Sequence, residues 1–364
     1  MIYFLLLFLI VFLYFFTKLF IRESNKQNKV FVALSFLAII VLFSLRSSTV
    51  GRDLPGYKTA YLFALTSDFS RFDYWEFSSF EIGYVLFMKV CSIMGLNFQL
   101  FLTVCSLLML VPVAVFIYRF SNNSLLSIIV FICYSFFEFY MSAIRQSISI
   151  SIFLIGLMVL LSKRKHSLLG YYFFCVIAFL FHYGAIVCFF LPLLKLIKKT
   201  TPFLIVSVLV TIFLLILRTP VFSFINTVFR GRDVGLESNV FFGLNSAILI
   251  ILVILFLILL EKMERNQSLD HQNILVVNNY QLFLKMVIVS ICISVFFGTS
   301  HMARTCMYYL IPIVLLLPNL NAFLSKKSEK VIVNIALACF LFVYFGITIF
   351  VENNLDIFPY YFFQ

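Results

Sequence analysis

The sequence has 364 residues, of which 63% are hydrophobic and 12% charged, and its mean hydropathy is +1.10. Ordinary globular domains contain about 45–50% apolar and about 25% charged residues. A soluble fold of this length buries too little surface to hide the excess of apolar side chains. The composition therefore excludes a soluble enzyme, a secreted disulfide scaffold and a disordered chain, and it predicts an all-α polytopic membrane protein.

Apolar runs that could form membrane helices follow one another along the whole sequence. In the first run, the apolar residues Ile2 to Phe16 precede the charges Lys18, Arg22, Lys26 and Lys29, which predicts a spanning helix whose N-terminus lies outside. No soluble domain separates the runs. They cover residues 2–21, 30–45, 82–96, 98–118, 124–141, 144–161, 167–181, 184–197, 202–217, 243–260, 282–300, 303–317 and 331–351.

Lysine and arginine residues in the short loops predict the orientation of these runs. With 163–165 on the cytoplasmic side, the loops alternate correctly only if one early run does not cross. The run 82–96 is short and contains Lys89, so we expect it to be a re-entrant or interfacial helix on the outer face. The expected architecture is a single membrane domain over 1–364, with about twelve spanning helices and both termini outside. It has outer loops 46–81 and 218–242 and a cytoplasmic loop 261–280.

In this topology the whole formal charge of +12 lies on the cytoplasmic face. The basic charge therefore reflects orientation and predicts no nucleic-acid partner. On the outer face arginine outnumbers lysine, although orientation gives no reason for it. Guanidinium groups bind phosphate and carboxylate bidentately, so we expect an oxyanion site there; pairing with the outer acidic residues is the alternative. The outer arginines are Arg46, Arg52, Arg71, Arg145, Arg218, Arg230, Arg232 and Arg304.

Arg145 begins the polar sequence Arg145-Gln146-Ser147 within the apolar run 144–161, and Ser149 lies one turn further on the same helix face. A charge inside an apolar helix costs a few kcal/mol and usually faces a protein or water cavity. We therefore favour a functional role for Arg145. Snorkelling to the membrane surface and a structural pair with Glu138 are the alternatives.

Two histidines are also candidates. His182 follows an apolar run at its outer end and precedes Tyr183-Gly184, which predicts a helix break. Histidine suits proton transfer near neutral pH, although an interfacial structural role is equally compatible. His301, Arg304 and Tyr308 recur at one-turn spacing and are expected on one face at the outer end of their run.

The outer loop after the second run contains Arg46, then Gly51-Arg52-Asp53, then Tyr57, and it ends at Glu81-Ile82-Gly83-Tyr84. Carboxylates, arginines and phenols together are typical of a surface that binds sugars or provides a base, and a solvated loop is the alternative. The sequence contains no P-loop, H-E-x-x-H, G-x-S-x-G or D-x-D motif, so it predicts neither a metal nor a cofactor.

Four ordered stretches resemble the EpsG family of exopolysaccharide polymerases, which is related in function to the Wzy O-antigen and capsule polymerases. A weaker fifth stretch is Ala303-Arg304 with Tyr308-Tyr309 and Pro312. The sequence has Arg52 where the family usually shows Ser or Thr, and Ser149 where it favours Ala. The four stretches are Arg46 with Val50-Gly51-Arg52-Asp53 and Tyr57, Phe80-Glu81-Ile82-Gly83-Tyr84, Ile144-Arg145-Gln146-Ser147-Ile148-Ser149-Ile150, and Ala178 with Phe181-His182-Tyr183-Gly184-Ala185.

The resemblance implies an enzyme of the bacterial plasma membrane with its active site on the outer face. It would join oligosaccharide repeat units carried on undecaprenyl diphosphate, transferring the growing chain to the non-reducing end of the next lipid-linked unit. A flippase and a chain-length regulator of the same pathway are expected partners beside the lipid bilayer. On this view the diphosphate contacts Arg145, Arg304, Arg46, Arg52 and His301, and the acceptor sugar contacts Tyr57, Gln146 and Tyr308.

Four outer residues could accept the proton of the attacking hydroxyl: His182, Asp53, Glu81 and His301. We place His182 first and Asp53 second, because Glu81 could instead anchor the segment 82–96 by pairing with an arginine. Two other classes remain open. A lipid-linked oligosaccharide flippase should show internal repeats and a charged path through both leaflets, and an outer-face acyltransferase needs an inner donor path, for which His166 is the candidate.

Overall fold

The computed structural model describes residues 2–66, 80–162, 164–228, 248–255, 257–258, 271–298, 301–320, 324 and 326–363. Helices make up all the regular structure in these ranges, and one isolated antiparallel bridge joins Arg46 to Phe362. The chain forms two compact units, one of Met1–Tyr183 with Leu317–Gln364 and the other of Gly184–Leu316. The expectation of an all-α protein is confirmed.

The structure bears on the expected number of spanning helices only through the residues that it describes. Within the described residues, six helices are long and apolar enough to cross a membrane, and three bent helix pairs raise the number to nine if each is one span. The expected count of about twelve is therefore not confirmed. Several runs form shorter helices, including Ile82–Ile93 and Ser167–Phe181. The twelve residues of Ile82–Ile93 rise about 18 Å, well short of the hydrocarbon thickness, which fits the expected non-crossing segment.

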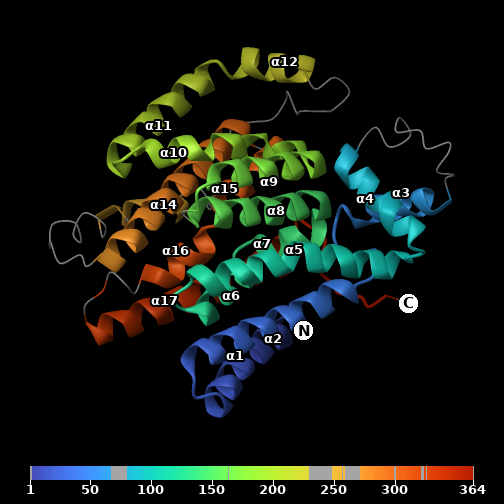
Figure 1. The fold of residues 1–364 in the computed structure, drawn as a ribbon, viewed down its shortest axis with the longest axis horizontal. Coiled ribbons are helices and arrows are strands. Elements are labelled where there is room, and N and C mark those ends of the chain that lie inside the picture. The colour runs from blue at the N-terminus through green and yellow to red at the C-terminus, as the bar shows by residue number, and fades with distance from the viewer. Residues whose placement is uncertain are drawn as a thin grey trace. The chain divides into compact units, whose positions relative to one another are not determined.

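In the first unit, α8 (Ile144–Leu161) is the most buried of the six described helices that are long enough to cross a membrane, and it packs between α5 (Phe98–Phe120) and α9 (Ser167–Phe181) (Figure 1). Small side chains allow this packing, because a Cβ at Gly156 would lie 3.0 Å from Phe174 Cβ. The other helices of this unit are α1 (Ile2–Phe20), α2 (Ser24–Ser44), α3 (Leu54–Thr66), α4 (Ile82–Ile93), α6 (Ser124–Cys133), α7 (Phe136–Ser142) and α17 (Lys327–Gly346), the last continued by a π-helical turn, Ile347–Glu352.

A sharp break divides the run 124–141 into α6 and α7, which meet at 56°. Ser135 adopts a left-handed conformation there (φ 54°), and its Oγ lies 2.8 Å from the Tyr344 hydroxyl of α17. Such a break is tolerated in a membrane where neighbouring side chains contact the freed polar groups. A second non-helical residue, Ala143, separates α7 from α8. The two breaks together place Arg145 in the first turn of α8.

The second unit is built around α14 (His271–Phe297), which contacts α10 (Leu191–Leu196), α11 (Thr200–Ile216) and α15 (Met307–Leu310). A 3-10 helix, His301–Cys306, precedes α15, and α16 (Ile313–Asn319) follows it at a bend of 44°. The remaining elements are α12 (Arg218–Val228) and a 3-10 helix, Tyr183–Phe190.

Three buried cations donate to carbonyl oxygens at helix C-termini, where the helix dipole favours positive charge. Lys285 contacts Leu194 O and Ile197 O at the end of α10, and Lys89 Nζ lies 3.2 Å from Ala64 O near the end of α3. Arg46 contacts Phe43 O of α2. These cations satisfy backbone groups that have no partner within their own helix.

Every terminal carbonyl of α2 has a donor from a different residue. Val41 O accepts from the Leu45 backbone, and Phe43 O accepts from Arg46. Leu42 O accepts from the Tyr360 hydroxyl at 2.8 Å, and Ser44 O accepts from the Gln99 amide. The C-terminal segment is therefore held against the end of α2.

Candidate active site

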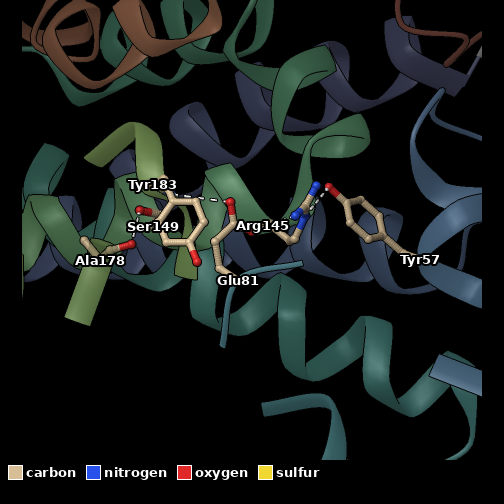
Figure 2. Close-up of polar contacts among 6 residues, drawn as sticks. All are labelled: Tyr57, Glu81, Arg145, Ser149, Ala178 and Tyr183. Atoms are coloured by element: carbon tan, nitrogen blue, oxygen red, sulfur yellow. Dashed lines mark hydrogen bonds and ion pairs between the residues drawn. The ribbon is translucent and has the colours of Figure 1, made fainter. Parts of the chain in front are cut away.

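Arg145 and Glu81 form an ion pair in the first unit. Arg145 Nη1 lies 2.6 Å from Glu81 Oε2, and 21% of the Arg145 side chain is exposed against 1% of Glu81 (Figure 2). A buried carboxylate requires such a partner, because an unpaired charge away from water is costly. The acidic partner of Arg145 is thus Glu81, 64 residues away in the sequence. The alternative that Arg145 pairs with Glu138 is therefore wrong. The pairing agrees with the expected anchoring role of Glu81.

The local fold explains how Glu81 reaches Arg145. Glu81 is the N-cap residue of α4 in an extended conformation, and its side chain makes no capping hydrogen bond to the described residues of that helix. The carboxylate turns instead toward α8. Gly83 permits the approach of α4 to α9, because a Cβ there would lie 2.7 Å from Leu180 O. The Glu81-Ile82-Gly83 sequence therefore supplies both the charge and the close helix contact.

Aromatic rings surround the guanidinium group of Arg145. Its Cζ lies 4.6 Å from the centre of the Phe80 ring and 5.6 Å from that of Tyr57, which are cation–π distances. Arg145 Nε also donates to the Tyr57 hydroxyl at 3.4 Å. Burial raises the pKa of Tyr57, although the Arg145 charge opposes the shift, so the phenol stays protonated at neutral pH. Tyr57 can therefore accept from Arg145 and donate to a further group.

Tyr84 adds a hydroxyl that the sequence analysis did not select. Its ring centre lies 5.7 Å from that of Tyr57 and 5.9 Å from that of Phe80. The hydroxyl is fully buried and has no hydrogen-bond partner among the described residues. Buried polar groups are usually paired, so this one is a candidate contact for a substrate atom. Its place one turn from Glu81 in α4 was the sequence signal that could have found it.

The end of α9 meets the ion pair. The Tyr183 backbone N–H points to Glu81 Oε1 at 3.4 Å, and Ser149 Oγ donates to Ala178 O at 2.6 Å (Figure 2). His182 is the C-cap residue of α9, is half-buried, and its N–H donates to Ala178 O. The backbone of His182 therefore lies directly beside the residue that contacts Glu81.

The loop before α3 is fixed by backbone contacts. Gly51 has φ +115°, and a Cβ on it would lie 2.8 Å from Met141 O, so this position requires glycine. The Asp53 N–H donates to Ser142 Oγ at 3.2 Å, and the Asp53 carbonyl accepts from the Tyr57 N–H. Exposed Arg52 donates to Asn354 O at 3.4 Å. The structure thus brings Asp53 and Tyr57 to one end of α8, with Arg52 turned to the C-terminal segment.

Arg46 was expected to contact the diphosphate, but the structure places its side chain in the interior of the first unit. Its side chain is 0% exposed, and its terminal nitrogens donate to Phe43 O and, at 3.2 Å, to Met141 O. Burial lowers the pKa of Arg46 to about 10, which still leaves it charged at neutral pH. These contacts give Arg46 a structural role, joining the ends of α2 and α7.

The remaining candidate residues lie in both units of the structure. Gln146 and Tyr308 are buried, as are Tyr57 and Tyr84, and Arg304 is half-buried in the 3-10 helix of the second unit. The backbone of His301 lies in the same 3-10 helix, and its side chain is outside the described part, as are Arg71, Arg230 and Arg232. Among the described residues, no three His, Cys, Asp or Glu side chains could together hold a metal ion.

The fold and site define a multi-pass membrane protein with a partly exposed arginine–carboxylate pair near one end of α8, the most buried of its described long helices. The family model of the EpsG family matches residues 29–362. The chain therefore belongs to the EpsG family, and the resemblance read from the four short stretches is confirmed. Membership indicates a role as a polysaccharide polymerase. Comparisons with curated proteins and with solved structures give no match.

Proposed function

We propose that the protein polymerises oligosaccharide repeat units carried on undecaprenyl diphosphate, on the outer face of the bacterial plasma membrane. The observation that carries the proposal is the Arg145–Glu81 pair, in which a buried carboxylate holds a guanidinium group that stays partly exposed. A fixed guanidinium suits a diphosphate, because its donors match the geometry of phosphate oxygens. The lipid bilayer would hold the polyprenyl chain, and a flippase and a chain-length regulator remain expected partners.

The proposed reaction transfers the growing chain from its lipid diphosphate to the next repeat unit. An acceptor hydroxyl oxygen forms a bond to the anomeric carbon, and the bond between that carbon and the diphosphate oxygen breaks. The electron pair stays on the diphosphate, where negative charge develops. Arg145 stabilises that charge with donors already in place. Tyr57, held against Arg145, donates a hydrogen bond from its hydroxyl to the same diphosphate or to the acceptor sugar and keeps its proton.

The acceptor hydroxyl must lose its proton to a nearby base. We assign this role to His182, with Asp53 as the second candidate. Glu81 is less suited to it, because its carboxylate is engaged by Arg145 at 2.6 Å and by the Tyr183 N–H. We therefore treat Glu81 as a positioning residue. The expected contributions of Arg304 and His301 to diphosphate binding stay predictions.

The test is polymer formation in a deletion strain that carries each variant at matched expression. Arg145→Lys should lose most polymer, since the charge remains while the planar fork is lost. Normal polymer from Arg145→Lys would exclude the bidentate role. His182→Ala should abolish polymer formation. If His182→Ala still forms polymer and Asp53→Asn does not, the base is the Asp53 carboxylate. Retention of single repeat units on the outer face separates a polymerase from a flippase, whose loss removes all repeat units from that face.

A further inference from the structure

A polar cavity of about 670 Å³ lies in the first unit, outside the Arg145 site. Its walls come from the loop at 47–49, the first half of α3, the start of α5 and the C-terminal segment. Both hydroxyl and amide side chains (Ser48, Thr49, Asn97 and Gln99) and aromatic ones (Tyr361 and Phe362) line it. The cavity is large enough for several sugar rings by the usual size of ligand pockets.

The aromatic wall is unusually exposed. Tyr361 and Phe362 keep 57% and 56% of their surface accessible, yet their backbones are fixed. The Ser47 N–H donates to Tyr361 O at 2.8 Å, and Phe362 forms the antiparallel bridge with Arg46. Accessible rings on a fixed backbone, beside hydroxyl and amide groups, suit a saccharide, because its apolar face packs on aromatic rings while its hydroxyls form hydrogen bonds.

Lys58 is the charged side chain of the cavity wall, and its Nζ lies 3.3 Å from Ser48 Oγ. It follows Tyr57 directly in α3. Because successive helix residues point about 100° apart, Tyr57 contacts Arg145 while Lys58 lines the cavity. Neighbouring residues of α3 thus contact the ion pair and line the cavity.

We propose that this cavity binds the saccharide part of a lipid-linked oligosaccharide, with Tyr361 and Phe362 stacking on sugar rings and Lys58 donating to a hydroxyl or an acidic group. The inference deepens the proposed function and depends on it for the identity of the substrate. The cavity is then a specificity site for the repeat unit, separate from the diphosphate contact at Arg145.

Two measurements test the proposal on the full-length protein in lipid nanodiscs. The first is saturation-transfer NMR with the repeat-unit oligosaccharide released from its lipid by mild acid, so that no diphosphate is present. The second is the KM and kcat of polymerisation with the intact lipid-linked unit. Tyr361→Ala and Lys58→Ala are compared with Phe8→Ala and Thr59→Ala, which change exposed residues outside the cavity wall.

We expect saturation transfer to the free oligosaccharide in the unchanged protein and its loss in Tyr361→Ala. We expect KM to rise about threefold to tenfold with kcat retained, as for loss of one aromatic contact, and Tyr361→Trp to restore both signals. The Phe8 and Thr59 variants should match the unchanged protein. Two results would contradict a saccharide site in the cavity without contradicting the polymerase function. One is the absence of an oligosaccharide signal, and the other is an unchanged KM in Tyr361→Ala while Arg145→Lys still loses polymer. If Arg145→Lys and Tyr361→Ala both polymerise normally, the proposed site itself fails.

Discussion

Glu81 Oε2 and Arg145 Nη1 lie 2.6 Å apart, and the carboxylate is almost wholly buried while the guanidinium reaches the surface. The two partners therefore differ in what their loss does. Removal of Arg145 strands a buried charge, whereas removal of Glu81 frees a cation that already contacts solvent.

Arg145→Ala should destabilise the protein by about 3–5 kcal/mol, the usual result of breaking a buried pair from one side. Thermal unfolding of the purified protein measures this. The double variant Arg145→Met with Glu81→Leu should recover much of the stability, because no buried charge remains, and should still form no polymer. Polymer from the double variant would show that the pair serves the fold and has no part in the reaction.

Gly83→Ala should cost about 1–3 kcal/mol, since the added methyl group would overlap Leu180 O and push α4 away from α9. The shift displaces Glu81, so polymer should fall more than protein level does. Gly56→Ala in α3 is the matched control, because no described heavy atom lies within 4 Å of its Cβ position. Equal behaviour of the two variants would exclude the close contact between α4 and α9.

Lys285→Met should destabilise the protein by about 1–3 kcal/mol, because Leu194 O and Ile197 O lose their donor inside the second unit. Lys198→Met, at an exposed position nearby, serves as the control. Thermal unfolding should separate the two variants. Polymer formed per folded molecule should be unchanged by Lys285→Met, since this lysine acts on the helix end alone.

The orientation can be tested by cysteine labelling in a variant without the native cysteines. A cysteine at Thr59 should react with a membrane-impermeant maleimide in intact cells, and one at Arg164 should react only after the membrane is opened. Both residues are exposed, so access depends on the side of the membrane. Equal labelling of the two in intact cells would overturn the proposed outer face of the site.

The sequence predicted the residues of the ion pair better than their roles. An arginine in an apolar run has to face a polar group, and this argument selected Arg145 without the structure. Its partner depends on how α4 packs against α8 and α9, which hydropathy does not encode. Glu138 is nearer in the chain, yet Glu81 makes the contact.

Arg46 shows the opposite case. Its charge and its place in the loop suggested an exposed ligand, but its burial is produced by residues 360–363 and by α7, which return from distant parts of the sequence. Hydropathy also could not predict how many spans the apolar runs form. The run 124–141 contains neither Gly nor Pro, yet the left-handed conformation of Ser135 breaks it into two helices. An apolar run and two half-helices have the same hydropathy.

The donors to α2 also set an order for assembly. The ribosome makes α2 long before Gln99, and much longer before Tyr360 and Phe363, whose N–H donates to Leu45 O. Until those residues emerge, the last carbonyls of α2 must be hydrated, because unpaired backbone groups are not stable in lipid. The C-terminal end of α2 therefore stays hydrated during synthesis. It loses this water only when residues 99 and 360–363 pack against it.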